Sequence, residues 1–150
     1  GSFTGVRVGL AAVKGLAEAA GKPALAVSNL KAVASFGQAA LRAPLLDARR
    51  GEIYGGLYDA ALKPLGPEVV TRFPLWLESL PKDGVEILTP DPAIFGPALA
   101  GWRVRQVPRA LAAAVARIAA LEDARDPALL DANYVRRSDA EKNWRDHGQQ

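Results

Sequence analysis

The glycine-rich turn at the start of the chain is the first feature whose residue types could do chemistry. Residues 1–5 read GSFTG and run directly into an apolar helical pattern. Backbone N–H groups at such a turn can cradle a phosphate group, and the candidates for this contact are Gly1, Ser2, Thr4 and Gly5. The segment lacks the Lys-Ser/Thr ending of a P-loop, so the pattern favours the other interpretation, a tight turn with Thr4 as the helix N-cap.

Cysteine is absent and histidine nearly so, which removes most classes of catalytic and metal centre. The 150 residues contain no cysteine and one histidine, His147. A disulfide scaffold, a thiolate metal site and a cysteine nucleophile are therefore excluded. A two-histidine metal site or a histidine–carboxylate pair would have to be built around that one residue near the C-terminus. We expect no catalytic residues, no metal and no cofactor.

A predicted hairpin and the C-terminal tail hold the remaining candidates. Asp47 could be an actin-like metal or phosphate carboxylate, but an aspartate that stabilises its own turn is the favoured interpretation. Tyr54 and Tyr58 share one strand face, which is more typical of packing than of base stacking. Trp144 with Arg145 could anchor the tail or a partner, and a simple hydrophobic staple is favoured.

Composition and charge are those of an ordinary globular protein. The chain is 49% hydrophobic and 23% charged, and its formal net charge is +3. Its one basic cluster is interleaved with acidic residues and consists of Arg136, Arg137, Lys142 and Arg145. Such a mixed run is typical of a solvated tail, so the charge permits an RNA-related role without arguing for one. No signal or transit pattern is visible.

Residues 4–20 predict a helix that is apolar on nearly every side. Its strongly polar positions, Arg7, Lys14 and Glu18, fall within about 40° of one another at about 100° per residue. Such a helix must be buried on most sides, and small residues spaced four apart let another backbone come close. We expect one side to pack in its own lobe and another to meet a partner helix. The predicted partner face consists of Gly5, Val6, Gly9, Leu10, Ala12, Val13, Leu16 and Ala17.

The pattern of the next residues completes an α-β-α order over residues 4–42. Residues 24–27 indicate a short buried strand, and Ser28 caps a second helix that ends before Pro44. The apolar stripe of that helix consists of Leu30, Val33, Ala34, Gly37 and Leu41.

Residues 43–123 predict the order β-β-β-α-β-α-β-α, which is that of a ribonuclease-H-like unit. The expected strands are 45–49, 52–59, 68–73, 85–89 and 102–107, and the expected helices are 74–80, 91–100 and 108–123. In the last helix Leu111, Val115, Ile118 and Leu121 are expected to face inward. We expect one sheet whose first three strands form an antiparallel meander.

The α-β-α order of residues 4–42 matches the last three elements of the same unit. Two such lobes in tandem make the actin-like ATPase (ASKHA) architecture. We therefore expect residues 1–42 to be the C-terminal part of a first lobe that lacks its β-β-β-α-β half. Residues 43–125 would form a complete second lobe, and residues 126–150 a polar tail.

Four motifs in this order resemble those of the bacterial TsaB (YeaZ) family. Residues 1–11 read GSFTGVRVGLA and are followed by KGLA at 14–17, which is similar to the family's GSFTGxRxGxxxxKGLA segment. Residues 27–30 (VSNL) resemble its VSSL, and residues 47–54 (DARRGEIY) its DARxGEVY hairpin. Residues 133–136 (NYVR) resemble PxYLR, with no proline before the tyrosine.

The resemblance implies a cytoplasmic, non-catalytic subunit in the biosynthesis of threonylcarbamoyladenosine in tRNA. It implies that the chain pairs with the sister subunit TsaD, that the ATPase TsaE joins them, and that tRNA is met only through the complex. It also implies that the helix at 4–20 lies in a bundle with the partner's helices, or forms a homodimer in isolation. No membrane association is implied.

Two other functional classes stay open from the residues. A nucleotide-binding ATPase or sugar kinase of the actin-like fold would need paired phosphate loops and a metal carboxylate. A glycoprotease-type metallopeptidase would need a spaced pair of histidine ligands, against which a single histidine counts heavily.

Overall fold

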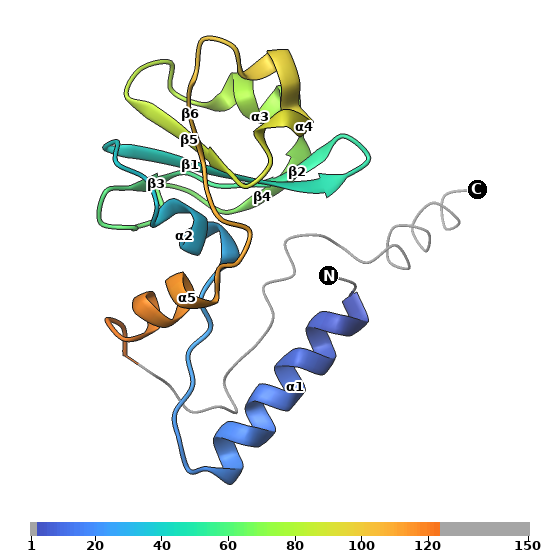
Figure 1. Cartoon of the computed structure of the whole chain (residues 1–150), viewed down its shortest axis with the longest axis vertical. Coiled ribbons are helices and arrows are strands. Elements are labelled where there is room, and N and C mark those ends of the chain that lie inside the picture. The colour runs from blue at the N-terminus through green and yellow to red at the C-terminus, as the bar shows by residue number, and fades with distance from the viewer. Residues whose placement is uncertain (1–2, 124–150) are drawn as a thin grey trace, which may run out of the picture. The chain divides into compact units, whose positions relative to one another are not determined.

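The computed structural model describes residues 3–123 (Figure 1), and the chain divides into two compact units. One unit comprises residues 1–26 with 122–150, and the other comprises residues 27–121. Residues 27–42, which the sequence pattern placed with a first lobe, belong to the second unit. No helix among residues 3–123 is long and apolar enough to cross a membrane.

The described part of the first unit is dominated by one helix, α1 (Phe3–Ala19). Gly21, two residues after the end of the helix, has a φ of 59°. The Gly21 N–H donates to the Glu18 carbonyl at 3.1 Å, and the Lys22 N–H donates to the Ala17 carbonyl at 2.8 Å. This is a Schellman C-cap, and it confirms glycine as the stop signal. The expected N-cap at Thr4 is wrong, because the helix already includes Phe3 and Thr4 lies within its first turn.

The second unit is built on a mixed sheet in the order β4-β2-β1-β5-β6. The strands are β1 (Leu41–Arg49), β2 (Glu52–Gly55), β4 (Val69–Arg72), β5 (Val85–Thr89) and β6 (Arg103–Gln106). β1, β2 and β4 form an antiparallel meander, while β5 and β6 run parallel to β1. The predicted element order and meander are confirmed. A two-residue strand, β3 (Tyr58–Asp59), also pairs with β1.

Helices cover both faces of the sheet (Figure 1). They are α2 (Asn29–Ala34), α3 (Phe73–Ser79), α4 (Pro92–Phe95), the 3-10 helix η1 (Gly96–Leu99) and α5 (Ala112–Ala119). Under α3 and η1, Trp76, Leu80 and Leu99 pack against Leu45 and Ile87. On the opposite face, α2 covers β1, β5 and Tyr58, and α5 packs against α2. Their buried residues are Leu30, Ala32, Val33, Ala34, Ala114 and Ile118.

Several boundaries around α2 differ from the prediction. Residues 25–28 form no strand, and Ala24 contributes a single bridge. Ser28 does cap α2, since its Oγ accepts from the Leu30 N–H at 3.1 Å. The helix is nevertheless short, so Gly37 lies in a loop and Leu41 begins β1. Pro44 therefore lies inside β1 rather than ending the preceding region.

Pro44 is tolerated in a central strand because β1 changes partner there. Residues 41 and 42 pair with β3, and pairing with β2 starts at Leu45. The proline falls between the two registers, so its missing N–H removes no bond from either antiparallel ladder. Its carbonyl accepts from the Gly56 N–H at 3.3 Å.

The last helix is shorter at both ends than residues 108–123. The Val107 N–H donates to the Thr89 carbonyl at 3.1 Å, and an ion pair between Arg109 and Asp91 holds the following loop, so α5 starts only at Ala112. Ile118 is buried, and Leu111 and Val115 pack against its cluster as expected. The expectation for Leu121 is wrong, because it lies beyond the helix and is 89% exposed.

Candidate functional site

The most unusual surface in the described residues is the apolar side of α1. Four of its large apolar side chains are exposed to between 46% and 72%: Val6, Val8, Val13 and Leu16. The sequence predicted a helix buried on nearly all sides, whereas the described residues leave these four side chains of α1 exposed. Exposed apolar side chains gathered on one element mark an interaction site.

The candidate partner face forms one continuous arc around α1. At about 100° per residue, its positions fall within roughly 160° of one another, from Ala12 round to Leu10. Gly9 lies near the middle of this arc, and among the described residues no heavy atom lies within 4 Å of where its Cβ would stand. Gly15 is equally open but lies outside the arc, about 60° from both Ala12 and Glu18.

The candidate phosphate turn is only partly described. Gly1 and Ser2 lie outside the described residues. Thr4 and Gly5 belong to the first turn of α1 rather than to a loop before it. Among the described residues, no loop precedes α1 in which the predicted phosphate contact could be examined.

Asp47 stabilises its own hairpin. Its Oδ1 accepts from the Arg49 N–H at 2.8 Å, next to a register shift in the pairing of β1 with β2. Arg49, Arg50 and Gly51 follow with φ values of 66°, 55° and 77°. The carboxylate is thus engaged by a turn of three left-handed residues, which agrees with the favoured interpretation.

Tyr54 and Tyr58 come from two short strands rather than one, and they pack in the same apolar cluster under α2. The Tyr58 hydroxyl donates to Glu68 Oε1 at 2.5 Å, and Ser28 Oγ donates to the same oxygen. Burial first, and then the hydrogen bond and charge of Glu68, raise the pKa of Tyr58 above its ordinary value. This bonding ties the N-cap of α2 to the segment before β4, and the sequence reading missed it.

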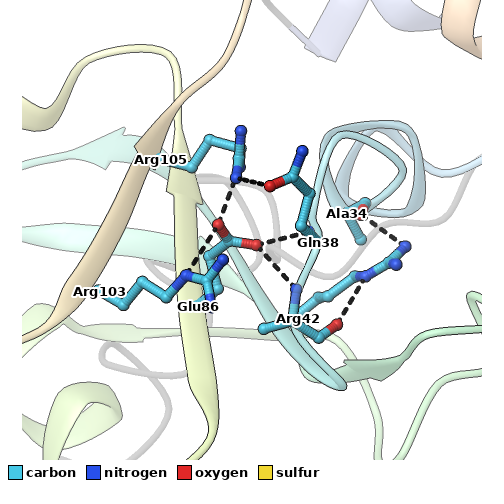
Figure 2. A network of polar contacts seen from close by, with 7 residues as sticks. Ala34, Gln38, Arg42, Glu86, Arg103 and Arg105 are labelled. Carbon is cyan, nitrogen blue, oxygen red and sulfur yellow. Dashed lines mark hydrogen bonds and ion pairs between the residues drawn. The ribbon is translucent and has the colours of Figure 1, made fainter.

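A second polar cluster, centred on Glu86 of β5, was also missed (Figure 2). The Glu86 side chain is only 1% exposed. Its Oε1 lies 2.8 Å from Arg105 Nε and 3.3 Å from Arg103 Nε. Its Oε2 accepts from the backbone N–H groups of Gln38 at 2.7 Å and Ala39 at 3.2 Å.

This environment keeps the buried carboxylate charged. Burial alone would raise the pKa of Glu86. The hydrogen bonds from the N–H groups of Gln38 and Ala39 and from Arg105 outweigh burial and hold the pKa below its ordinary value. Arg105 Nη2 also donates to Gln38 Oε1 at 2.7 Å, so the loop after α2 and the edge strand β6 are joined through one carboxylate.

Residues 3–123 contain no group of three or more His, Cys, Asp or Glu side chains that could hold a metal ion. His147, Trp144 and the motif at 133–136 lie outside the described residues. The candidates that the structure describes are therefore the exposed apolar side of α1 and the polar clusters of the α/β unit.

Comparison with known proteins decides the family. The model of the family described as "TsaD: tRNA N6-adenosine threonylcarbamoyltransferase" matches residues 1–84, more than half of the chain. The chain belongs to this family, in its TsaB (YeaZ) branch. Three of the four TsaB motifs lie within the matched residues.

A curated relative and two solved structures support this assignment. The chain is 40% identical over 85 residues to the tRNA threonylcarbamoyladenosine biosynthesis protein TsaB of Bacillus subtilis (strain 168). It matches a structure described as an uncharacterized protein with similarity to peptidase YEAZ from Pseudomonas aeruginosa, at 25% identity and a TM-score of 0.59. It matches YeaZ from Pseudomonas aeruginosa at 29% identity and a TM-score of 0.55.

These matches differ in how much of each protein they span. The curated match covers 53% of this chain and 37% of the TsaB protein. The structural matches cover 91% and 81% of this chain, and 69% and 62% of the two solved chains. The mixed α/β sheet described above is thus of the YeaZ kind, and the chain spans little more than a third of the curated relative that it matches.

Proposed function

We propose that this chain is a non-catalytic subunit of the machinery that makes threonylcarbamoyladenosine in tRNA. It pairs through α1 with the sister subunit TsaD, the ATPase TsaE joins the pair, and the site of action is the cytoplasm. The family description and the name of the B. subtilis relative both refer to this tRNA modification, which supports the proposal.

The observation that carries the pairing is the exposed apolar arc of α1. Val6, Val13 and Leu16 lie on this arc and are 46%, 51% and 72% exposed. Burying apolar surface is worth about 25 cal/mol per Å² before the costs of association. The small residues Gly9 and Ala12 let a partner helix approach closely. A stripe of small residues gives no such advantage to a helix that faces water.

The second unit supports the proposed lobe arrangement. Its sheet order β4-β2-β1-β5-β6, with three antiparallel strands and then two parallel ones, is the arrangement of a ribonuclease-H-like lobe. We infer that residues 43–125 are the second lobe of an actin-like fold and that α1 derives from the first. The tail at 126–150 follows the second lobe.

The test is co-purification of the chain with TsaD after Gly9→Leu, with circular dichroism of each variant. Leucine is a better helix former than glycine, so α1 itself is not weakened. A bulky side chain in a close helix contact costs about 1–3 kcal/mol, and we expect the affinity for TsaD to fall about 5- to 150-fold.

Gly15→Leu is the matched control, because Gly15 is equally open but lies off the arc. It should leave the affinity for TsaD unchanged. Equal pairing by the Gly9 and Gly15 variants would show that the arc is not the interface. Absence of any binding between the unaltered chain and TsaD would overturn the proposed function.

A further inference from the structure

One guanidinium of the cluster around Glu86, that of Arg103, lies over β5 beside the carboxylate and stays more than half exposed. Arg103 and Arg105 lie two residues apart on β6, and Arg103 is directly opposite Glu86 in the parallel register. Both arginines reach the same carboxylate oxygen through Nε (Figure 2). The Nη edge of a guanidinium is the part that binds a phosphate with two parallel hydrogen bonds. Binding through Nε leaves that edge of Arg103 available.

Arg103 contributes little to the fold. The charge of Glu86 is already met by Arg105 at 2.8 Å and by two backbone N–H groups. Arg103 lies farther away, at 3.3 Å, and its side chain is 58% exposed. An ion pair with so exposed a partner contributes little to stability. The need to neutralise Glu86 therefore accounts for an arginine at position 105 but not for a second one at position 103.

The cluster also carries a surplus of positive charge. Arg42 lies beside it, donating from Nε to the Ala39 carbonyl and from Nη1 to the Ala34 carbonyl. Two guanidinium groups thus contact the carboxylate, which is itself almost inaccessible to solvent, and the third is held by backbone carbonyls of residues 34 and 39. An approaching anion meets the arginines and not the buried negative charge.

We propose that the β6 edge, with Arg103 as its contact residue and Arg105 and Arg42 behind it, binds the phosphodiester backbone of tRNA. The inference rests on the proposed function, because the polyanion that such a subunit meets is tRNA. An exposed arginine on an edge strand suits an extended phosphate backbone, whereas a small nucleotide needs a concave site that buries it. The contact is direct, whereas the family resemblance implies contact only through the complex.

The experiment measures tRNA affinity against salt concentration for the chain in complex with TsaD, with Arg103→Gln as the variant. Losing one phosphate contact should lower the salt-dependence slope by about 1 and weaken binding about eightfold at 0.1 M salt. Arg117→Gln, on α5, removes the same charge away from this edge and is the control. It should leave both quantities close to those of the unaltered complex.

Three outcomes would overturn the inference. One is identical tRNA binding by the Arg103 and Arg117 variants. Another is a complex that forms but does not bind tRNA, which leaves the proposed pairing with TsaD intact. The third is ATP binding, measured by calorimetry, that is weakened by Arg103→Gln while tRNA binding is unchanged. Co-purification tests separately whether the chain pairs with TsaD, and a failure to pair would contradict the proposed function rather than this inference.

Discussion

At the scale of single residues, Glu86 shows how a carboxylate remains charged inside a sheet. Three hydrogen-bond donors share its two oxygens, one from Arg105 of β6 and two from backbone N–H groups after α2, and Arg103 adds an ion pair. Each oxygen therefore has a full set of partners, which is the condition under which a buried charge is tolerated.

Replacing this carboxylate should make stability less dependent on pH. Glu86→Gln leaves two guanidinium groups without their anion, and we expect a loss of about 2–4 kcal/mol at pH 7. The pKa of Glu86 is lowered by folding, so its contribution is present above its ordinary pKa of about 4.3 and is lost as pH falls through the lower folded value. The difference between the two proteins should thus shrink on acidification.

Urea denaturation at pH 7 and at pH 3 measures this difference. Glu78→Gln removes an exposed carboxylate from α3 and is the control, with little expected effect at either pH. A loss for Glu86→Gln that is the same at both pH values would contradict the assigned role of its charge.

The sequence could not have revealed this network. Glu86 stands in the strand pattern VEILT, where one polar residue is compatible with a half-exposed position. Its partners Gln38 and Ala39 lie nearly fifty residues away, in a segment predicted to be helical. Only the parallel pairing of β1 with β5, and of β5 with β6, brings the three segments together. By contrast, the turn role of Asp47 was predictable because its partner is two residues away.

At the scale of elements, local signals predicted the existence and order of strands better than their ends. Residues 85–89 were predicted without error, since a short strand-forming run, VEILT, is bounded by glycine and proline. Pro44 misled the prediction for β1, because a proline between two hydrogen-bonding registers cannot be recognised before the registers are known. The start of α5 was also hidden, because the loop before it is held by contacts with Thr89 and Asp91.

The packing of α3 on β2 depends on the absence of a side chain at Gly55. A Cβ at this position would lie 2.5 Å from Trp76 Nε1 and 2.7 Å from Ile53 Cδ1. Trp76 and Ile53 are buried in the same cluster and have little room to move. We expect Gly55→Ala to lower the free energy of unfolding by about 1–3 kcal/mol in urea titrations.

Gly66→Ala provides the comparison for this experiment. A Cβ at Gly66 would meet no described heavy atom within 4 Å, so the same methyl group adds no clash there. If the two alanine variants unfold at the same urea concentration, the close approach of Trp76 to Gly55 does not limit the packing.

At the scale of the whole molecule, the two compact units differ in how their apolar residues are covered. Residues 27–121 bury most of theirs on both faces of a sheet, and their exposed large apolar residues, Leu65, Leu75, Ile94 and Leu121, lie on separate segments. α1 in the other unit instead leaves four large apolar side chains exposed on one helix. The family motifs at 1–17 predicted a partner-binding helix, but only the structure shows which of its apolar side chains stay exposed.

We expect the isolated chain to self-associate through α1. Light scattering coupled to size exclusion should show a mass that rises with concentration toward that of a dimer or larger species. Leu16→Glu places a charge on the exposed arc and should shift the chain to a monomer. Leu121→Glu changes an even more exposed leucine outside α1 and should leave the mass unchanged. A monomer at every concentration would contradict this expectation.

The position of β1 in the sheet has a consequence during synthesis on the ribosome. β2 and β4 follow β1 closely in the chain, but β5 ends about 40 residues after it. At about 5–20 residues per second, β1 has one unpaired edge for about 2–8 seconds. Ala43 and Leu45, which are fully buried in the finished protein, are open to other nascent chains during that time. We expect the chain to depend on chaperone cover until Thr89 has left the ribosome.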